Sequence, residues 1–370
     1  MTARPVLLLG DTLKLGGTEG QFVEIARGLP RSRWTPHVAC VRAEGPLRER
    51  LDTAGIAPWS CGPSSFRSPS LLGTLLGVAR YLRQHRIRLV HSFDFYSNIV
   101  GVLAARLTTR TIVIASQRDL GDLRTPFQQR IHRLMLRLAD HVLVNTRAIT
   151  DRLARELPRL TERLALVPNG VDLTRFSAVT QTPRSKARPL AIGTLANLRV
   201  EKGLHDFVRA AADVHARCPS TRFVIWGDGP LRDSLEDLVR QLGLAALFVL
   251  PGRTREPARA LRRLDVFVLP SHSEACSNVL LEAMATQRAV IATRVGGNPE
   301  LVEDEISGLL VPPGDPAALA KAILRLVEDP HLAQSLAHGA QQRVSSRFSK
   351  DAMLAAIDAL YHRALHLETV

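Results

Sequence analysis

Short apolar runs alternate with amphipathic stretches along the whole chain. The runs at 6–9, 266–269 and 289–292 are almost wholly apolar and are bounded by turn or polar residues. Such runs are typical of strands buried on both faces of a parallel sheet. The stretches at 70–84 and 125–140 repeat apolar residues at helical spacing. This alternation predicts an α/β fold with parallel sheets and helices on both faces.

The length of the chain and a break in this pattern predict two domains. At 370 residues the chain is long for one hydrophobic core. The segment 177–189, SAVTQTPRSKARP, is polar and contains proline, as linkers do. We predict a first domain at 1–175, a second at 176–348, and a segment at 349–370 with the apolar spacing of a helix that packs on another part of the chain. Further strands are expected at 37–41, 87–91, 111–117, 141–145, 164–167, 190–195, 223–226, 247–250 and 309–311.

The stretch 265–285 combines a strand, a polar loop and a helix that starts near Asn278. Ser277 or Asn278 can cap this helix, whose backbone N–H groups and positive dipole end then face the loop. Such a helix start favours a phosphate. Glu274 and Glu282 flank it, and carboxylates suit hydroxyl groups. A ligand with central phosphates and hydroxyls at both ends is a nucleotide sugar. The alternative is that this arrangement occurs by chance and has no function, since strand–loop–helix units are common in doubly wound folds.

Two loops ahead of predicted helices have ligand-binding character. The loop 196–203 contains Arg199 and Lys202, which suit a diphosphate, although two basic residues in a loop are also common on solvated surfaces. The adjacent Gly16 and Gly17 allow close backbone approach of a ligand, or form an ordinary turn.

The segment SEACSNVLLEAMA at 273–285 strongly resembles the signature of glycosyltransferase family 4, the retaining transferases of the GT-B fold. The resemblance covers most of the chain, and the second half more tightly than the first. It implies two Rossmann-like domains facing across a cleft, with a C-terminal helix crossing back. Its other segments, in the family's order, are GGTE at 16–19, VPNGVD at 167–172, GTLANLRVEKG at 193–203, WGDGP at 226–230, PGR at 251–253 and VGGNPELVEDEISGLLVPPGD at 295–315.

The resemblance assigns roles to individual residues. Glu282 is expected on the ribose hydroxyls and Glu274 on those of the transferred sugar. The remaining expected donor contacts are Lys202, Arg199 and the N–H groups of Asn278 and Val279 on the diphosphate, the Gly16 and Gly17 loop over it, and Arg253 near the base.

Two positions depart from the family's pattern. Asn197 occupies the usual place of an arginine, and Arg199 lies two positions further on. The family's His-x-His pattern becomes His91-Ser-Phe93 here. We expect His91 to contact the sugar or acceptor, or alternatively to be a structural histidine at a strand end.

The expected reaction follows from the resemblance and from one absence. No Asp-x-Asp occurs in the sequence, so we expect metal-independent transfer with no cofactor beyond a UDP- or GDP-sugar. The expected activity is a retaining glycosyltransferase that acts on a glycan or lipid-linked glycan in bacterial envelope or exopolysaccharide biosynthesis. A sugar-nucleotide-binding protein without turnover is the alternative.

Composition places this chain among soluble globular proteins. Hydrophobic residues make up 45% of it and the mean hydropathy is +0.02. No apolar run approaches a membrane span, and the apolar start is too short for a secretory signal. The four cysteines have no paired spacing, which fits a reduced, cytoplasmic setting.

The positive charge is concentrated in the first half. Residues 1–175 contain 26 Lys and Arg against 14 Asp and Glu, a net of +12, whereas residues 176–370 contain 23 against 21, a net of +2. A basic surface attracts nucleic acid or anionic lipid, but no nucleic-acid module is present. We expect either peripheral contact with an anionic membrane or a merely soluble basic surface.

The predicted helix at 125–140 bears on the choice between membrane contact and a merely soluble basic surface. Its apolar stripe is predicted to pack in the core, and a basic amphipathic helix facing a membrane is the alternative. The stripe comprises Phe127, Ile131, Leu134, Met135 and Leu138, with Arg130, Arg133 and Arg137 opposite or flanking.

Overall fold

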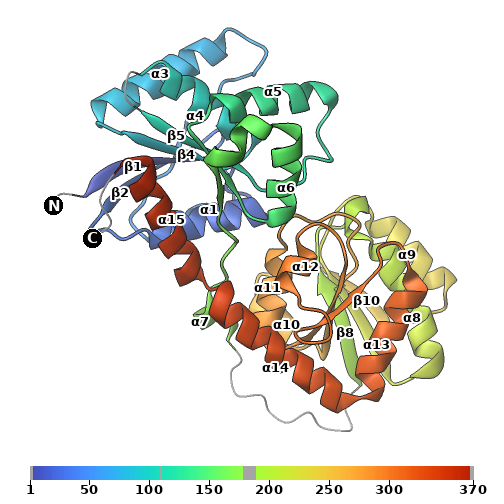
Figure 1. Cartoon of the computed structure of the whole chain (residues 1–370). Coiled ribbons are helices and arrows are strands. Elements are labelled where there is room, and N and C mark those ends of the chain that lie inside the picture. Colours follow the sequence, from blue (N-terminus) through green and yellow to red (C-terminus); the bar gives the residue numbers. More distant parts are fainter. Residues whose placement is uncertain (1–2, 109–110, 178–188, 367–370) are drawn as a thin grey trace. The chain divides into compact units, whose positions relative to one another are not determined.

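The computed structural model describes residues 3–108, 111–177 and 189–366 (Figure 1). Its internal contacts divide the chain into two compact units. Unit 1 comprises residues 1–169 and 351–370, and unit 2 comprises residues 170–350. Almost all of the predicted linker lies outside the described residues.

Unit 1 is a seven-stranded parallel sheet covered by helices. Its strands are β1 (Arg4–Gly10), β2 (Trp34–Cys40), β3 (Trp59–Ser60), β4 (Leu89–Ser92), β5 (Ile112–Gln117), β6 (His141–Val144) and β7 (Leu164–Leu166). They lie in the order β3-β2-β1-β4-β5-β6-β7. Its helices are α1 (Gly17–Gly28), α2 (Arg48–Asp52), α3 (Ser70–Gln84), α4 (Phe95–Arg106), α5 (Pro126–Leu138), α6 (Arg147–Glu156), the 3₁₀ helix η1 (Pro158–Arg163) and α15 (Lys350–Ala364).

The alternation of side chains along β1 separates two helical layers. Val6 and Leu8 share a core with α1 and with Ile357 and Tyr361 of α15. Leu9 lies on the opposite face, where it approaches α4. Helices α3, α4 and α5 lie side by side (Figure 1). The C-terminal helix is therefore an integral part of the core of unit 1.

Unit 2 repeats this architecture with a six-stranded parallel sheet. Its strands are β8 (Leu190–Leu195), β9 (Thr221–Trp226), β10 (Phe248–Gly252), β11 (Val266–Leu269), β12 (Ala289–Thr293) and β13 (Leu309–Val311), in the order β10-β9-β8-β11-β12-β13. Two apolar cores lie on its two faces. Its helices are α7 (Leu173–Phe176), η2 (Val200–Lys202), α8 (Leu204–Arg217), α9 (Arg232–Gln241), α10 (Pro257–Arg262), α11 (Asn278–Ala285), α12 (Asn298–Leu301), α13 (Pro316–Glu328) and α14 (Pro330–Arg347). The predicted α/β class with two doubly wound parallel sheets is confirmed.

Residues 170–175 belong to unit 2, whereas the sequence placed them in the first domain. Val171 forms a parallel bridge with Ser349. Asp172 caps α7 and forms a 2.6 Å ion pair with Lys350. These contacts tie the segment to the end of α14, so the division falls after Asn169.

The prediction that the apolar stripe of α5 packs in the core is wrong for most of its members. Phe127, Leu134 and Leu138 are exposed. The face that packs inward instead presents His132 and Leu136 together with Met135. No helix in the described part of the chain is both long enough and apolar enough to cross a membrane.

Candidate functional site

The strand order of unit 2 reverses between β8 and β11, and the loops that follow these two strands meet there. In open α/β sheets, ligands bind outside the carboxyl ends of the strands at such a switch point. The sequence-predicted residues Arg199 and Lys202 lie in the first loop, and Glu274 lies in the second.

Helix α11 begins at Asn278, as predicted. Ser277 is its N-cap, with its hydroxyl accepting a 3.4 Å hydrogen bond from the Leu280 N–H. Asn278 and Val279 form the first turn, where the positive end of the helix dipole lies. Glu282 lies on the same helix and is half-buried. The helix therefore directs a partial positive charge toward the loop that contains Glu274.

Glu274 and Lys202 are in direct contact. The Lys202 Nζ donates to Glu274 Oε1 at 2.6 Å, and the two side chains are 24% and 10% exposed. The sequence had given these residues separate roles, on sugar and on phosphate. The structure shows that the cation and the carboxylate form one unit, so a ligand that draws Lys202 away also changes the charge environment of Glu274.

Sequence reasoning missed Ser271, which fixes the same carboxylate. Its hydroxyl donates to Glu274 Oε1 at 2.9 Å, and the residue is fully buried. Its carbonyl accepts a 2.5 Å hydrogen bond from the Thr293 hydroxyl. The position of Ser271, at the end of β11 and three residues before Glu274, was the only signal in the sequence. Ser271 is a positioning residue for Glu274.

The two loops are interlocked through backbone contacts. The Glu201 carbonyl accepts hydrogen bonds from the N–H groups of His272, at 2.8 Å, and Ser273, at 3.4 Å. Gly203 has φ +60, and a Cβ there would lie 2.0 Å from the Pro270 carbonyl oxygen. His272 Nε2 also lies 2.6 Å from an Asp206 carboxylate oxygen. The geometry between Lys202 and Glu274 is therefore built into the backbone.

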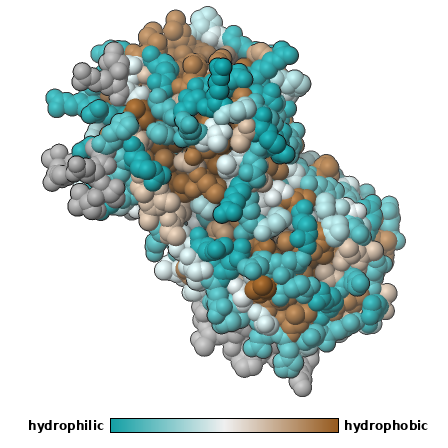
Figure 2. Space-filling model, in the orientation of Figure 1, coloured by the Kyte–Doolittle hydropathy of each residue, from teal (hydrophilic) through white to brown (hydrophobic). Residues whose placement is uncertain are grey.

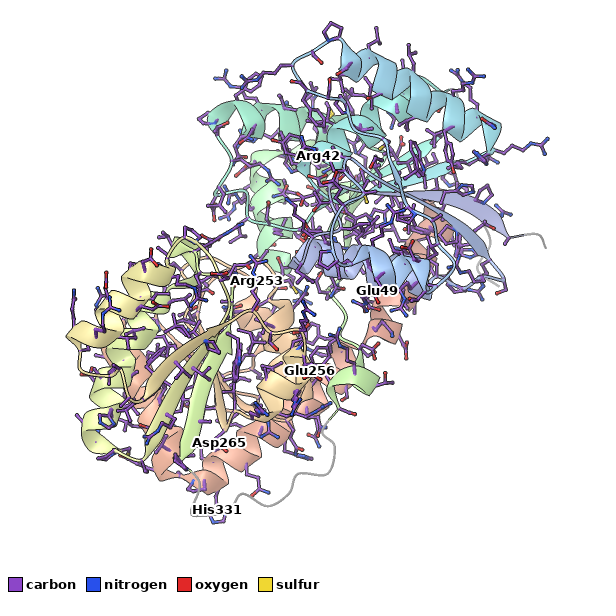
Figure 3. All side chains as sticks on the ribbon, turned by 180° about the vertical axis from the view of Figure 1, so that it is seen from behind. Arg42, Glu49, Arg253, Glu256, Asp265 and His331 are labelled. Carbon is purple, nitrogen blue, oxygen red and sulfur yellow. The ribbon has the colours of Figure 1, made fainter. Side chains whose placement is uncertain are left out.

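Two further predicted residues of unit 2 are exposed in loops. Arg199 is exposed and directly precedes η2, while Arg253 is exposed just after β10 (Figure 3). Arg232 was not singled out by the sequence analysis. Its guanidinium donates to the Gly227 carbonyl at 2.9 Å and to the Leu250 carbonyl at 3.1 Å. Arg232 thereby joins the turn after β9 to β10.

Gly16 and Gly17 lie in unit 1. Gly17 is the first residue of α1, and Gly16 is its N-cap. A Cβ on Gly16 would lie 2.1 Å from a carboxylate oxygen of Glu19, so the glycine makes room for that side chain. Burial raises the pKa of Glu19.

His91 lies at the end of β4, inside the core of unit 1. It is fully buried, its Nδ1 lies 2.7 Å from the Tyr361 hydroxyl, and its Nε2 lies 2.9 Å from the Ser116 hydroxyl. Its ring stacks on Phe93 at 4.0 Å. Burial, reinforced by Arg118, holds the pKa of His91 well below its usual value. Both ring nitrogens of His91 are thus engaged inside the core of unit 1.

The switch point of unit 1 lies between β1 and β4 and contains two carboxylates that the sequence did not single out. Asp11 accepts hydrogen bonds from the N–H groups of Ser97, at 2.6 Å, and Tyr96, at 3.3 Å. Asp94 is the N-cap of α4 and accepts from the Phe95 N–H at 2.7 Å. The start of α4, a place suited to anions, is thus already occupied by carboxylates.

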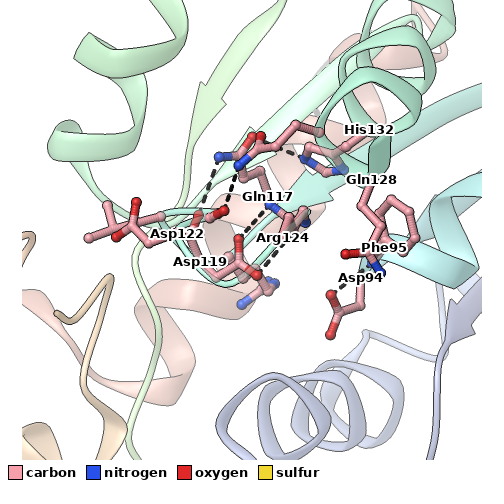
Figure 4. A network of polar contacts seen from close by, with 12 residues as sticks. Asp94, Phe95, Gln117, Asp119, Asp122, Arg124, Gln128 and His132 are labelled. Carbon is pink, nitrogen blue, oxygen red and sulfur yellow. Dashed lines mark hydrogen bonds and ion pairs between the residues drawn. The ribbon is translucent and has the colours of Figure 1, made fainter. Parts of the chain in front are cut away.

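Further polar residues lie beside Asp94 at the end of β5 (Figure 4). Arg124 forms a 2.8 Å ion pair with Asp119, and His132 Nε2 lies 3.1 Å from the Gln117 side-chain oxygen. Burial lowers the pKa of His132 to about 3. Burial, reinforced by Asp11, raises the pKa of Asp94 to about 7.

The raised pKa of Asp94 predicts a pH-dependent stability. Because the folded protein holds this proton more tightly than the unfolded chain, the contribution of Asp94 to the free energy of unfolding falls as pH rises from about 4 to about 7. Asp94→Asn keeps a capping oxygen for α4 without the charge. We expect it to be about 2 kcal/mol more stable than the wild type at pH 8 and equal at pH 4, after allowance for partial exposure. Urea unfolding at both pH values measures this, and a destabilised variant at pH 8 would contradict it.

Two family models and two relatives that match this chain are named as glycosyltransferases. The family model described as "Glycosyltransferase Family 4" matches residues 15–175, and the model "Glycosyl transferases group 1" matches residues 189–329. A D-inositol 3-phosphate glycosyltransferase from Corynebacterium urealyticum is 32% identical over 78% of this chain and 75% of its own length. The putative colanic acid biosynthesis glycosyltransferase WcaL of Escherichia coli is 33% identical over 60% of this chain and 56% of its own.

A solved structure shares the fold over nearly the whole chain. HepE from Anabaena in complex with UDP superposes with a TM-score of 0.84, at 22% identity, covering 97% of this chain and 100% of that one. The two-unit architecture described above is therefore the GT-B fold of these structures.

Proposed function

This chain belongs to glycosyltransferase family 4 and is a nucleotide-sugar-dependent glycosyltransferase, and from that premise we propose the course of its reaction. It moves a sugar, with retention of the anomeric configuration and without a metal ion, from a UDP- or GDP-sugar to a glycan or lipid-linked glycan. The observation that carries the proposal is the meeting of Lys202, Glu274 and the start of α11 at the switch point of unit 2.

Positive charge at this point serves the leaving group. Negative charge builds on the diphosphate as the bond from the sugar breaks, and fixed positive groups stabilise it. Lys202, the dipole of α11 with the N–H groups of Asn278 and Val279, and the exposed Arg199 supply this charge. These groups do the work that a divalent ion does elsewhere, and this supports transfer without a metal.

The two carboxylates bind alcohols on either side of the diphosphate. Glu274 is held at Oε1 by Ser271 and Lys202, which fixes the direction in which the carboxylate can accept hydrogen bonds from sugar hydroxyls. Glu282, one helical turn into α11, binds the ribose hydroxyls. Arg253, just after β10, lies near the base.

The acceptor is a glycan or lipid-linked glycan of the bacterial envelope. A relative named for colanic acid biosynthesis supports a polysaccharide pathway. The net charge of +12 in residues 1–175 supports work at an anionic membrane surface, on its inner face. HepE was solved with UDP and with UDP-glucose, which makes uridine donors the first to test.

Turnover without acceptor tests this proposal. We expect the purified chain to release free sugar and nucleoside diphosphate slowly from a UDP- or GDP-sugar, with retained configuration in the first product seen by NMR. Tight binding of a nucleotide sugar with no release on any acceptor would instead favour a binding protein without turnover.

A further inference from the structure

The outer face of α5 alternates large apolar side chains with arginines. Phe127 is 65% and Leu134 is 48% exposed. Arg130 and Arg137 are exposed on the same side of the helix, and no ion pair in the described part of the chain involves either. Leu123, just before α5, is 75% exposed. This arrangement exposes to water side chains that fold into the core in most soluble helices.

Helix α3 presents a face of the same kind. Leu72 and Leu76, one turn apart, are 60% and 55% exposed, and Arg80 continues the row. Helix α4 packs against both α3 and α5 and is buried along most of its length. The three helices therefore form one layer. Hydrophobic residues lie along the edge of unit 1 where α3 runs, at the top of the view in Figure 2.

This layer contains no acidic side chain. Helices α3, α4 and α5 contain no Asp or Glu, and neither do residues 53–93, 95–118 and 123–139. The arginines of the three helices are Arg80, Arg83, Arg106, Arg130, Arg133 and Arg137. Arg106 pairs with Asp140 and Arg133 with Glu156, so Arg80, Arg83, Arg130 and Arg137 are the arginines with which the layer adds to the excess positive charge of the first half.

We propose that the outer face of α3 and α5, with Leu72, Leu76, Phe127 and Leu134 as apolar contacts and Arg130 and Arg137 beside them, docks on an anionic lipid bilayer. The apolar side chains enter the boundary between headgroups and acyl chains, and the guanidinium groups bind lipid phosphates. This surface deepens the proposed membrane association, and it rests on the proposed function because a lipid-linked acceptor is the reason for docking.

Charge and chemistry favour a bilayer over other occupants. In a symmetric dimer through this face, each helix layer would meet a second acid-free, arginine-bearing layer, and the like charges would repel. Nucleic acid would use the arginines but would leave the leucines and Phe127 in water. An anionic bilayer satisfies both kinds of side chain at once.

Co-sedimentation of the full chain with vesicles tests the surface. We expect binding to phosphatidylglycerol–phosphatidylcholine vesicles at least about tenfold tighter than to phosphatidylcholine vesicles. The double variant Phe127→Ser/Leu134→Ser and the double variant Arg130→Gln/Arg137→Gln are each expected to weaken binding to the anionic vesicles by about tenfold. All four side chains are exposed, so neither variant disturbs the core.

Matched controls lie in unit 2. Val249→Ser/Ile306→Ser removes two equally exposed apolar side chains, and Arg222→Gln/Arg347→Gln removes two exposed arginines. Binding by these controls should stay within about twofold of the wild type. The proposal is overturned if neutral and anionic vesicles bind equally, if the unit 1 variants bind as the wild type does, or if the unit 1 variants change only a self-association seen without lipid.

Donor hydrolysis, measured on the same variants, separates this surface from the proposed function. Unchanged hydrolysis with lost vesicle binding supports the surface. Hydrolysis without vesicle binding in the wild type overturns the surface alone. Vesicle binding by a wild type that never turns over a nucleotide sugar overturns the proposed function and leaves the surface standing.

Discussion

Glu274→Gln is expected to lower kcat/KM for the nucleotide-sugar donor by about 100-fold or more. Glu274 Oε1 now accepts from both Lys202 and Ser271. A neutral amide cannot balance the Lys202 ammonium, and it cannot present two acceptor oxygens to both the protein and the sugar. The measurement is steady-state kinetics of donor hydrolysis, together with the melting temperature of each variant.

Two further variants serve as comparisons for Glu274→Gln. Ser271→Ala removes one hydrogen bond to Glu274 but keeps the charge, so a loss of about three- to tenfold, mainly in kcat, is expected. Glu328→Gln, at an exposed ion pair with Arg217, should leave the kinetics unchanged. Activity of Glu274→Gln within twofold of the wild type would show that the carboxylate does not contact the donor.

Gly203→Ala is expected to destabilise unit 2 by about 3 kcal/mol and to weaken donor binding. Gly203 has φ +60, and the new Cβ would lie 2.0 Å from the Pro270 carbonyl oxygen. Relief of this overlap must separate the loop that contains Lys202 from the loop that contains Glu274. Thermal unfolding and donor titration measure the two effects.

Gly243→Ala is the matched control for this substitution. Gly243 has φ +71 with nothing within 4 Å of its ideal Cβ, so alanine there incurs only the left-handed penalty of about 1 kcal/mol. Equal losses at the two glycines would show that the close approach of the loops does not matter.

Local patterns predicted the parts of the site that depend on neighbouring residues. The boundaries of β8 at 190–195 and β13 at 309–311 match the predicted strands. The start of α11 at Asn278 follows from a serine cap directly before an apolar helix. In each case the residues that predict the element lie within it or within a few positions of its ends.

Contacts between distant segments could not be predicted in this way. Lys202 and Glu274 lie 72 positions apart and meet only because β8 and β11 are neighbours at the switch point. The engagement of His91 depends on Tyr361, 270 positions away. Helical spacing located the apolar stripe of α5, but it could not show that α4 and the sheet use a different side of that helix.

The central claim is that the switch point of unit 2 binds the diphosphate of a nucleotide sugar. The most direct test is the melting temperature of the wild type and of Lys202→Ala in the presence of UDP-, GDP- and ADP-sugars. At least one ligand should stabilise the wild type, by about 2.7 kcal/mol at a concentration 100 times its Kd. Lys202→Ala should lose most of that protection. No protection by any nucleotide sugar, or equal protection of both proteins, would contradict the claim.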